Sequence, residues 1–342
     1  MKNIIVTGGA GYIGSHTIVE LIKNDYNPIV VDDFRNSDTS VILNLSKITG
    51  KDIQYFSIDI CDKNALDEQL RGINVDSVIH FAAYKAVGES VVQPLKYYHN
   101  NLNGLINILN WSTENNVKNF IFSSSCTVYG EPKDTKEVSE ENSIGIANSP
   151  YGQTKIMGEQ ILIDVKASGN QLKILSLRYF NPIGAHSSGL IGELPLGKPN
   201  NLLPFITQTA MGIYPELTVF GNDYPTSDGT CIRDYIHVTD LADAHVKGVH
   251  FLSNNPNNQV EFINIGTGKG TSVLEMITAF EKISGLQLKW KFGDKRPGDV
   301  VEIFANSKKA NILLKWTPQF TVEDAIADAW KWEQNIRNNQ IQ

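Results

Sequence analysis

The sequence predicts an α/β fold, with a doubly wound parallel sheet and a smaller mixed α/β C-terminal domain. The chain opens with a strand-like run, a glycine-rich turn and an amphipathic helix, and strand and helix patterns then alternate as far as residue 177. After residue 180 a connection rich in Gly, Pro and Asn runs to Pro204. The 342 residues suffice for two domains, which we expect at 1–180 and 181–342.

The composition argues against several classes of function. Lys and Arg total 30 and Asp and Glu total 37, for a net charge of -7, without a basic block that would follow a nucleic acid. We therefore expect no nucleic-acid partner. The three cysteines, Cys61, Cys126 and Cys231, form no CxxC pair, so neither a disulfide framework nor a metal site is indicated. The chain shows no signal-peptide pattern and no apolar run of membrane-spanning length, so we expect a cytoplasmic protein without a membrane partner.

The first elements are typical of a dinucleotide site. A strand pattern at 3–7 is followed by the letters GGAGYIG and by a helical pattern at 15–23. Gly8 permits a tight turn, Gly11 lets backbone N–H groups approach a pyrophosphate, and Gly14 lets the helix pack closely on the strand. The spacing is GxxGxxG rather than the GxGxxG of the Rossmann fingerprint, so this loop alone is weak evidence for a Rossmann-type domain.

The next strand supplies an acidic residue at the expected place. The pattern at 28–31 ends in Asp32, 18 residues beyond Gly14. A carboxylate there accepts from a ribose 2'-hydroxyl and repels a 2'-phosphate, which favours NAD over NADP. Arg35 is a counter-signal, because a guanidinium could bind that phosphate. Ordinary turn chemistry is the alternative explanation for Asp32 and Asp33.

The alternation continues through the first domain, with right-handed crossovers that predict a parallel sheet. Strand patterns cover 53–58, 76–81, 119–123 and 172–177, and helical patterns cover 63–71, 95–115 and 151–168. Several candidate residues lie at or after the carboxyl ends of these strands or on the next helix, where ligands bind in such sheets: Asp59, Ile60, Phe81, Ala82, Ala83, Lys85, Asn100 and Ser123 to Ser125. Each alone is equally compatible with a capped or solvated residue, but their shared location argues for a ligand crevice.

The pattern of helices and strands changes in the predicted second domain. Helical patterns cover 202–212, 240–253, 273–284 and 322–337, and strand patterns cover 217–220 and 261–265. Arg233 and Arg296 lie in polar loops, and guanidinium groups bind a diphosphate well. A surface ion pair with Asp234 or Asp299 is an equally good explanation for either one.

A candidate catalytic pair opens the helix at 151–168. Ser149 and Pro150 are a typical N-cap and first residue, and Tyr151 and Lys155 lie four apart, on one helix face. A positive charge about 5 Å away lowers the pKa of a phenol by about 2 units at an effective dielectric of about 20, which prepares Tyr151 as a general base. Ser125, 26 residues earlier, could hydrogen-bond the same substrate oxygen.

With these motifs in one order, the sequence resembles the extended short-chain dehydrogenase/reductases and, within them, the UDP-glucose (UDP-galactose) 4-epimerase family. The resemblance covers nearly the whole chain. It is carried by TGGAGYIGSHT at 7–17, HFAAYKAVGES at 80–90, NFIFSSSCTVYG at 119–130, SPYGQTK at 149–155, LRYFNPIGAH at 177–186, PNNLLPF at 199–205 and FGNDYPTSDGTCIRDYIHVTDLADAH at 220–245.

The resemblance implies roles for individual residues. Tyr151 is then the base, Lys155 holds the nicotinamide ribose and tunes Tyr151, and Ser125 assists at the sugar hydroxyl. The implied NAD-binding residues are Gly8, Gly11, Tyr12, Ile13, Gly14, Asp32, Asn36, Ser37, Asp59, Ile60, Phe81, Ala82, Ala83, Lys85, Asn100, Ser125, Tyr151, Lys155 and Phe180. The implied residues of the UDP-sugar site are Lys85, Ser125, Tyr151, Asn181, Asn201, Leu202, Phe220, Arg233, Arg296, Asp299 and Ile303.

The resemblance also implies an activity. An NAD-dependent isomerase of this kind interconverts UDP-galactose and UDP-glucose, through hydride transfer from sugar C4 to NAD and a 4-keto sugar that turns over before the hydride returns. This places the chain in galactose metabolism. The family expectation is a homodimer built from the helices at 95–115 and 151–168.

Two positions depart from the family pattern, and other activities remain open. Cys126 stands where a small residue such as Ala is familiar. Ile303, at the position that gates sugar size, is neither a large aromatic nor a small residue, and its bulk favours plain hexoses. An epimerase for UDP-N-acetylhexosamines or UDP-uronates is the alternative. A 4,6-dehydratase would carry an acidic pair next to the Thr or Ser of this motif, whereas Cys126-Thr127-Val128 has no carboxylate. An inactive NAD-sensing regulator would be expected to lack Tyr151 or Lys155.

Overall fold

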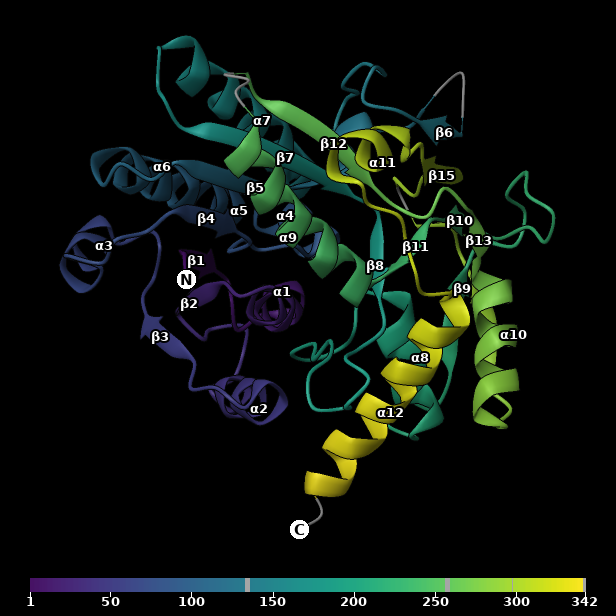
Figure 1. Ribbon diagram of the computed structural model, residues 1–342. Coiled ribbons are helices and arrows are strands. Elements are labelled where there is room, and N and C mark those ends of the chain that lie inside the picture. Colours follow the sequence, from purple (N-terminus) through teal and green to yellow (C-terminus); the bar gives the residue numbers. More distant parts are fainter. Residues whose placement is uncertain (133–135, 256–258, 297, 341–342) are drawn as a thin grey trace.

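The computed structural model describes residues 1–132, 136–255, 259–296 and 298–340 (Figure 1). Its centre is a seven-stranded sheet in which every neighbouring pair is parallel. In spatial order the strands are β12 (Glu261–Ile265), β7 (Lys173–Tyr179), β5 (Asn119–Ser125), β4 (Ser77–His80), β1 (Asn3–Thr7), β2 (Asn27–Asp32) and β3 (Gln54–Ser57). The predicted Rossmann-type doubly wound sheet is confirmed.

Helices cover both faces of this sheet. One face packs on α1 (Tyr12–Lys23), α2 (Ser40–Thr49), α9 (Val238–Asn254) and α11 (Lys308–Leu314), and the other on α3 (Lys63–Gln69), α6 (Gly104–Glu114) and α7 (Pro150–Ala167). Successive strand residues point to opposite faces. In β1, Ile4 and Val6 accordingly belong to the first core and Ile5 to the second.

The smaller part of the molecule contains short sheets and three longer helices. Strand β8 (Asn181–Ile183) pairs with β11 (Tyr235–His237), and β9 (Leu217–Phe220) with β14 (Trp290–Gly293). A four-stranded sheet has the order β13 (Thr271–Ser272), β10 (Ile232–Arg233), β15 (Glu302–Ala305) and β6 (Glu137–Val138). Helices α8 (Leu202–Ala210), α10 (Val273–Ser284) and α12 (Val322–Gln340) lie together at one side of the molecule (Figure 1). Phe205, Phe280 and Ile326 are buried in the core that they share.

The large sheet contains elements from both sides of the predicted boundary at residue 181. β12 pairs in parallel with β7 along its whole length, and α9 packs against α1 on the face of the main sheet. The chain therefore leaves the large sheet at 181, returns to it for 238–265, and returns once more with α11 at 308–314. Periodicity predicted the strand at 261–265 correctly. It could not show that this strand pairs with β7.

The helix predicted at 95–115 is not continuous. The segment consists of α5 (Pro94–Tyr98), a π-helical turn at His99–Asn103, and α6, and it is preceded by α4 (Val87–Val92). In the π-helical turn the Asn101 amide donates to the Tyr84 carbonyl (3.0 Å) and to Thr154 Oγ1 (3.1 Å). π-Helical turns inside α-helices are frequent at functional sites. This one fastens the segment to α7, the helix that carries Tyr151.

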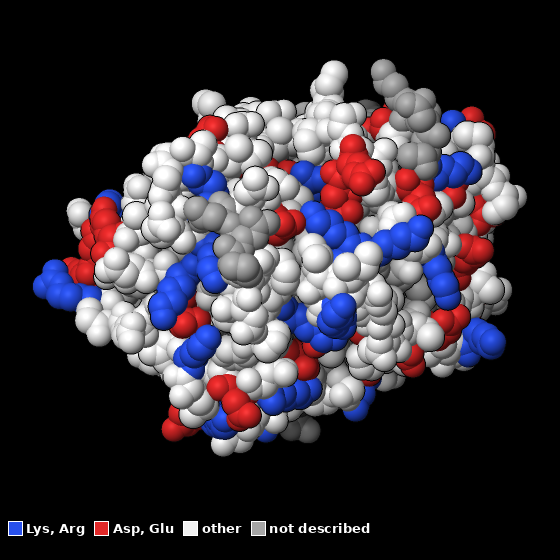
Figure 2. All heavy atoms as spheres, turned by 45° about the horizontal axis from the view of Figure 1, so that its top comes forward, with Lys and Arg blue, Asp and Glu red and all other residues white. Residues whose placement is uncertain are grey.

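The charged side chains of the surface are mixed in sign. On the face shown in Figure 2, Lys and Arg side chains are interspersed with Asp and Glu, without a continuous basic area. Within the described residues, no helix is long and apolar enough to cross a membrane, and no group of three or more His, Cys, Asp or Glu side chains could hold a metal ion.

Candidate active site

The glycine loop joins β1 to α1 at the carboxyl edge of the large sheet. Gly8 has a φ of +68°, and a Cβ there would lie 2.8 Å from the backbone N of Ala82. A Cβ on Gly14, in the first turn of α1, would lie 2.2 Å from the Gly8 carbonyl oxygen. Both positions therefore require glycine, for the turn and for the close approach predicted from sequence. Gly11 is the N-cap residue of α1.

Asp32, at the end of β2, is oriented by three hydrogen bonds. Its Oδ2 accepts from the backbone N of Ala10 (3.1 Å), and its Oδ1 accepts from the backbone N of Phe34 (2.9 Å) and from Ser37 Oγ (3.0 Å). Burial raises the pKa of Asp32, and the three hydrogen bonds oppose that rise. The carboxylate is thus fixed where the second strand meets the glycine loop.

Arg35 does not act as a free cation beside Asp32. Its guanidinium forms ion pairs with Asp33 (Nε to Oδ2, 2.6 Å) and with Asp59, and it donates to the Tyr84 hydroxyl (3.2 Å). Two carboxylates already neutralise this cation, so Arg35 is less available to bind the 2'-phosphate of NADP.

A cleft enclosing about 1010 Å³, part of it open to solvent, runs along this edge of the sheet. It is lined by Gly8, Gly11, Tyr12, Ile13, Gly14, Val31, Asp32, Asp33, Arg35, Asn36, Ser37, Ile58, Ile60, Phe81, Ala82, Ala83, Tyr84, Lys85, Asn100, Ser123, Tyr151, Lys155 and Tyr179. Most of the predicted cofactor residues come together here, and the lining does not include Asp59, Ser125 or Phe180. Tyr84 and Tyr179 also line the cleft although neither was predicted as a cofactor residue, whereas Ser123 belongs to the strand end that was predicted to face a ligand.

The start of α7 has the predicted cap. Ser149 Oγ accepts from the backbone N of Gly152 (3.2 Å), and Pro150 is the first helical residue. This cap fixes where the helix begins and therefore which residues face the cleft. Tyr151 and Lys155 both line it.

Lys155 is held in place by the neighbouring strand. Its Nζ donates to the backbone carbonyl of Ser123 (2.6 Å) and lies 5.8 Å from the centre of the Tyr151 ring and 5.0 Å from that of Phe122. Ser125, the last residue of β5, hydrogen-bonds the Tyr151 phenol. The predicted Ser, Tyr and Lys therefore meet at one end of the cleft.

The pKa of Tyr151 differs from the sequence prediction. Burial raises it to about 12, and the hydrogen bond with Ser125 opposes the rise. Burial also lowers the pKa of Lys155 to about 8, and the Glu159 carboxylate opposes that shift. The predicted lowering of the phenol pKa by Lys155 is thus wrong for the chain alone, because desolvation dominates and the Lys155 ammonium donates to the Ser123 carbonyl.

We expect Lys155 to titrate near pH 8 in the cofactor-free protein, well below its ordinary pKa of 10.5. Between these values the unfolded chain binds more protons than the folded one, so the contribution of Lys155 to stability increases as pH rises through this window. NMR of isotope-labelled lysine side chains, assigned with Lys155→Met, measures this pKa. Glu159→Gln should lower it further. A Lys155 pKa at or above 10 would contradict the prediction.

A buried ion pair between Glu159 and Arg178 connects α7 to the strands that carry Ser124 and Ser176. Glu159 on α7 accepts from Arg178 at both oxygens (Nε to Oε1, 2.9 Å; Nη2 to Oε2, 2.7 Å), and its Oε1 also accepts from Ser124 Oγ (2.7 Å) and Ser176 Oγ (3.1 Å). Both charged side chains are only 5% exposed. The Glu159 carboxylate, one helical turn after Lys155, therefore joins α7 to β7 and to the residue of β5 that precedes Ser125.

A second group of predicted residues lies around Asp299. Asp299 accepts from Arg296 (Nε to Oδ2, 2.9 Å) and lies 3.8 Å from Arg233, measured from Oδ1 to Nη2. The Arg296 guanidinium stacks over the Phe220 ring at 5.0 Å. Both predictions for the arginines are compatible with this arrangement: each guanidinium has Asp299 as a partner, and the two lie close enough to bind one diphosphate.

Ile303 connects this group to the catalytic end. It is aligned with Arg233 in the parallel β10–β15 pair and is buried. It shares a small apolar core with Phe180 and with the partly buried Cys126, the neighbour of Ser125. The position predicted to sense sugar size thus lies in the apolar core beside the serine.

Asn181 and Asn201 lie on two further elements. The backbone N of Asn181, the first residue of β8, donates to the Asp234 carbonyl (3.0 Å). Asn201 is the N-cap residue of α8, which begins at Leu202, but its amide donates to Glu193 rather than capping the helix. Glu193 was not predicted, because it lies in a connection without a recognisable motif.

The residues of the cleft fit the implied cofactor. The glycine loop leaves space that any Cβ on Gly8 or Gly14 would close, the N-terminus of α1 faces an anion favourably, and the carboxylate of Asp32 suits a ribose hydroxyl. NAD would be held by these groups along the edge of the sheet, with Tyr151 and Lys155 lining the same cleft.

The fold and this site define a dinucleotide-dependent α/β enzyme with a Ser, a Tyr and a Lys at one end of the cofactor cleft. The sequence matches the NAD dependent epimerase/dehydratase family over residues 4–266, and the chain belongs to that family.

Relatives within the family are similar over their whole length. The chain is 49% identical over 335 residues to the UDP-glucose 4-epimerase of Bacillus subtilis (strain 168), covering 98% of each chain. The structure is similar, with a TM-score of 0.95 and 44% identity, to a UDP-glucose-4-epimerase from Stenotrophomonas maltophila with bound NAD and formylated UDP-arabinopyranose, covering 99% of this chain and 100% of that one. It is also similar to the UDP-glucose 4-epimerase of Bifidobacterium longum in complex with NAD+ and UDP (TM-score 0.94, 42% identity, 98% and 99% covered).

Proposed function

We propose that this protein is an NAD-dependent UDP-glucose 4-epimerase, an isomerase that interconverts UDP-galactose and UDP-glucose. One observation carries the proposal: the Tyr151 phenol and the Lys155 ammonium line the dinucleotide cleft, next to the strand end that carries Ser125. The Arg233 and Arg296 guanidinium groups lie on the substrate side, where a diphosphate would bind. Relatives that carry this name at 49% identity, over nearly the full length, support it.

The chain's own residues perform proton transfer and orientation. Tyr151 Oη removes the proton of the sugar 4-hydroxyl and later returns it, while Ser125 Oγ holds the same oxygen by a hydrogen bond. Lys155 Nζ, fixed by the Ser123 carbonyl, places a positive charge near the phenol. Bound NAD would supply the acceptor and the donor of the C4 hydride and, in its oxidised form, a positive charge that favours loss of the phenolic proton.

The substrate side explains how the sugar can turn. Arg233 and Arg296 bind the diphosphate, which is remote from C4, so the UDP group supplies binding free energy while the hexose is held only loosely. The sugar can then present either face of C4 to the cofactor. This separation of binding from chemistry is what an epimerase requires.

A direct assay tests the proposal. The protein is incubated with UDP-galactose and NAD, and the anomeric protons are followed by NMR, with UDP-glucose as the expected product. A 4-keto-6-deoxy sugar would indicate a dehydratase instead. Absence of any conversion at enzyme concentrations that bind both ligands would reject the epimerase assignment.

We also propose that plain hexoses are preferred over N-acetylated sugars, because Ile303 is bulky and packed in the core beside the serine. The kcat/KM for UDP-N-acetylglucosamine should be at least about tenfold below that for UDP-glucose, and Ile303→Ser should narrow this ratio. Ile312→Ser, an exposed position on α11, is the matched control and should leave the ratio unchanged. Equal rates with both sugars in the unmodified protein would refute the preference.

A homodimer is proposed on the exposed apolar side chains of α4, α5 and α7. Val91 and Val92 are exposed on α4, Leu95 on α5, and Met157 and Ile163 on α7, and these helices pack side by side. Exposed apolar side chains gathered on neighbouring helices are typical of an interface. Light scattering should give a mass near twice that of the 37.9 kDa chain, and a monomer at micromolar concentration would contradict this.

The three free cysteines agree with the expected cytoplasmic location.

A further inference from the structure

A single carboxylate oxygen connects the two sides of the candidate site. Glu193 lies in the connection between β8 and α8. Its Oε1 accepts from Lys85 Nζ at 2.7 Å and from Asn201 Nδ2 at 2.6 Å. Lys85 lines the dinucleotide cleft, whereas Asn201 is the N-cap residue of α8 on the substrate side. The oxygen of Glu193 therefore joins one side chain from each side.

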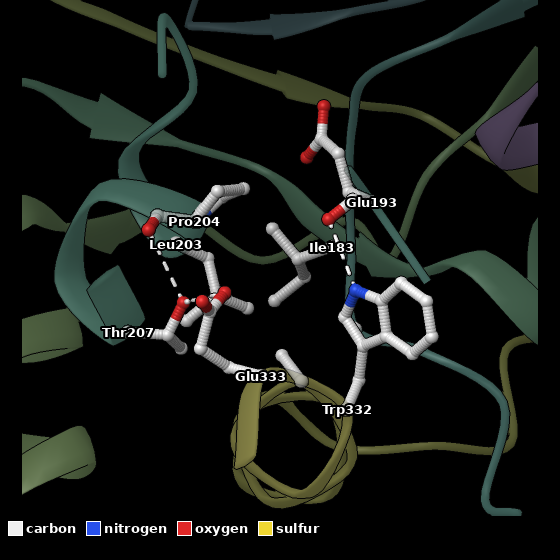
Figure 3. Close-up of a pocket in the computed structure, with 9 residues that line it drawn as sticks. Ile183, Glu193, Leu203, Pro204, Thr207, Trp332 and Glu333 are labelled. Atoms are coloured by element: carbon white, nitrogen blue, oxygen red, sulfur yellow. Dashed lines mark hydrogen bonds between the residues drawn. The ribbon is translucent and has the colours of Figure 1, made fainter. Parts of the chain in front are cut away.

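The backbone of Glu193 is anchored independently by the C-terminal helix. Its carbonyl oxygen accepts from Trp332 Nε1 on α12 (3.1 Å). A Cβ on the preceding residue, Gly192, would lie 2.5 Å from the Trp332 ring, so the chain passes in direct contact with the indole. Figure 3 shows the Glu193 carboxylate pointing away from α12 while its backbone oxygen points to Trp332. The side chain is thus directed toward the cleft by a fixed support.

The exposed fractions of Glu193 and Lys85 indicate that the carboxylate holds the lysine in place. The Glu193 side chain is 11% exposed and that of Lys85 is 49% exposed. Lysine is a long, flexible cation, and fixing it in one orientation costs conformational entropy. A largely buried carboxylate that makes a charge-assisted hydrogen bond can hold it, and here the ammonium lies 5.8 Å from the centre of the Tyr12 ring. Lys85 therefore has a defined position before any ligand binds.

We propose that Glu193 is a positioning residue of the sugar-nucleotide site, which acts by holding Lys85 and Asn201 in place through one carboxylate oxygen. Ligand binding then does not have to order these two side chains, and affinity increases for that reason. The inference rests on the proposed function only in taking a uridine diphosphate as the ligand. It assigns Glu193 no contact with the reacting atoms.

Binding of UDP tests this role without requiring turnover. By calorimetry, Glu193→Gln should weaken UDP binding by about tenfold, the effect of losing one charge-assisted hydrogen bond, and should raise KM while kcat changes by less than about threefold. Glu216→Gln, which removes the partner of Lys291 at the surface, is the matched control and should leave both quantities unchanged. In a Lys85→Met, Asn201→Ala background, adding Glu193→Gln should alter UDP affinity by less than about twofold.

Two results would overturn the inference. One is an unchanged UDP affinity in Glu193→Gln, and the other is the same tenfold loss in the Lys85→Met, Asn201→Ala background, which would show that Glu193 acts through other groups. If the Gln variant does not fold, Glu193→Asp replaces it, since it keeps the charge but shortens the reach, and unchanged UDP affinity there counts equally against the role. An unmodified protein that binds UDP but converts no UDP-galactose would reject the proposed function and leave this inference standing.

Discussion

Tyr151→Phe is expected to reduce the kcat for conversion of UDP-galactose by about 10²- to 10⁴-fold, the usual contribution of a positioned general base. The substitution removes only the phenolic oxygen, which is the group that would take the proton of the sugar 4-hydroxyl. Because burial raises the pKa of Tyr151 to about 12, the phenol depends on the nearby Lys155 ammonium and on the charge of the oxidised cofactor to lose its proton. Steady-state rates and UDP affinity should be measured together, because the affinity should remain within about threefold.

The matched control for this variant is Tyr55→Phe. Tyr55 is 47% exposed on β3 and does not line the cleft. Its variant should keep the full rate. If Tyr151→Phe kept more than a tenth of the original rate, Tyr151 would not be the base, and the mechanism proposed above would have to be abandoned.

Glu159→Ala is expected to lower the free energy of unfolding by about 3–5 kcal/mol, because it leaves the Arg178 guanidinium charged, buried and without its carboxylate. Ser124 and Ser176 lose their acceptor in the same variant. Urea unfolding of the cofactor-free protein measures the effect.

The control for Glu159→Ala is a surface pair of the same chemistry. Asp243 and Lys247 lie four residues apart on α9, and both are about one-third exposed. Asp243→Ala should change the free energy of unfolding by less than about 1 kcal/mol. Equal destabilisation by the two variants would show that burial of the Glu159–Arg178 pair has no special weight.

The local structure that the sequence predicted correctly is the structure that short spacings determine. The glycine loop, Asp32 at the end of a strand, and the Ser149 cap that presents Tyr151 and Lys155 on one face all depend on residues within a turn or two of each other. Local geometry follows from local sequence in such cases, because backbone dihedrals and helix periodicity fix it.

What the sequence missed depends on tertiary contacts. The pKa of Tyr151 is determined by burial, which no helix spacing reveals, so the predicted direction was wrong. Glu193 was missed because its partners, Lys85 and Asn201, come from distant parts of the chain. The π-helical turn at His99–Asn103 was read as part of a regular helix, since its apolar pattern continues across the turn.

The return of the chain to the large sheet has a consequence for biosynthesis. β12 hydrogen-bonds along β7, yet more than eighty residues separate the two strands in sequence. While a nascent chain emerges from the ribosome, β7 remains an unpaired edge until residue 265 has been synthesised, and such edges readily pair with other chains. Truncation near residue 180 would make that exposure permanent, so the first 180 residues are a poor choice for expression as a separate fragment.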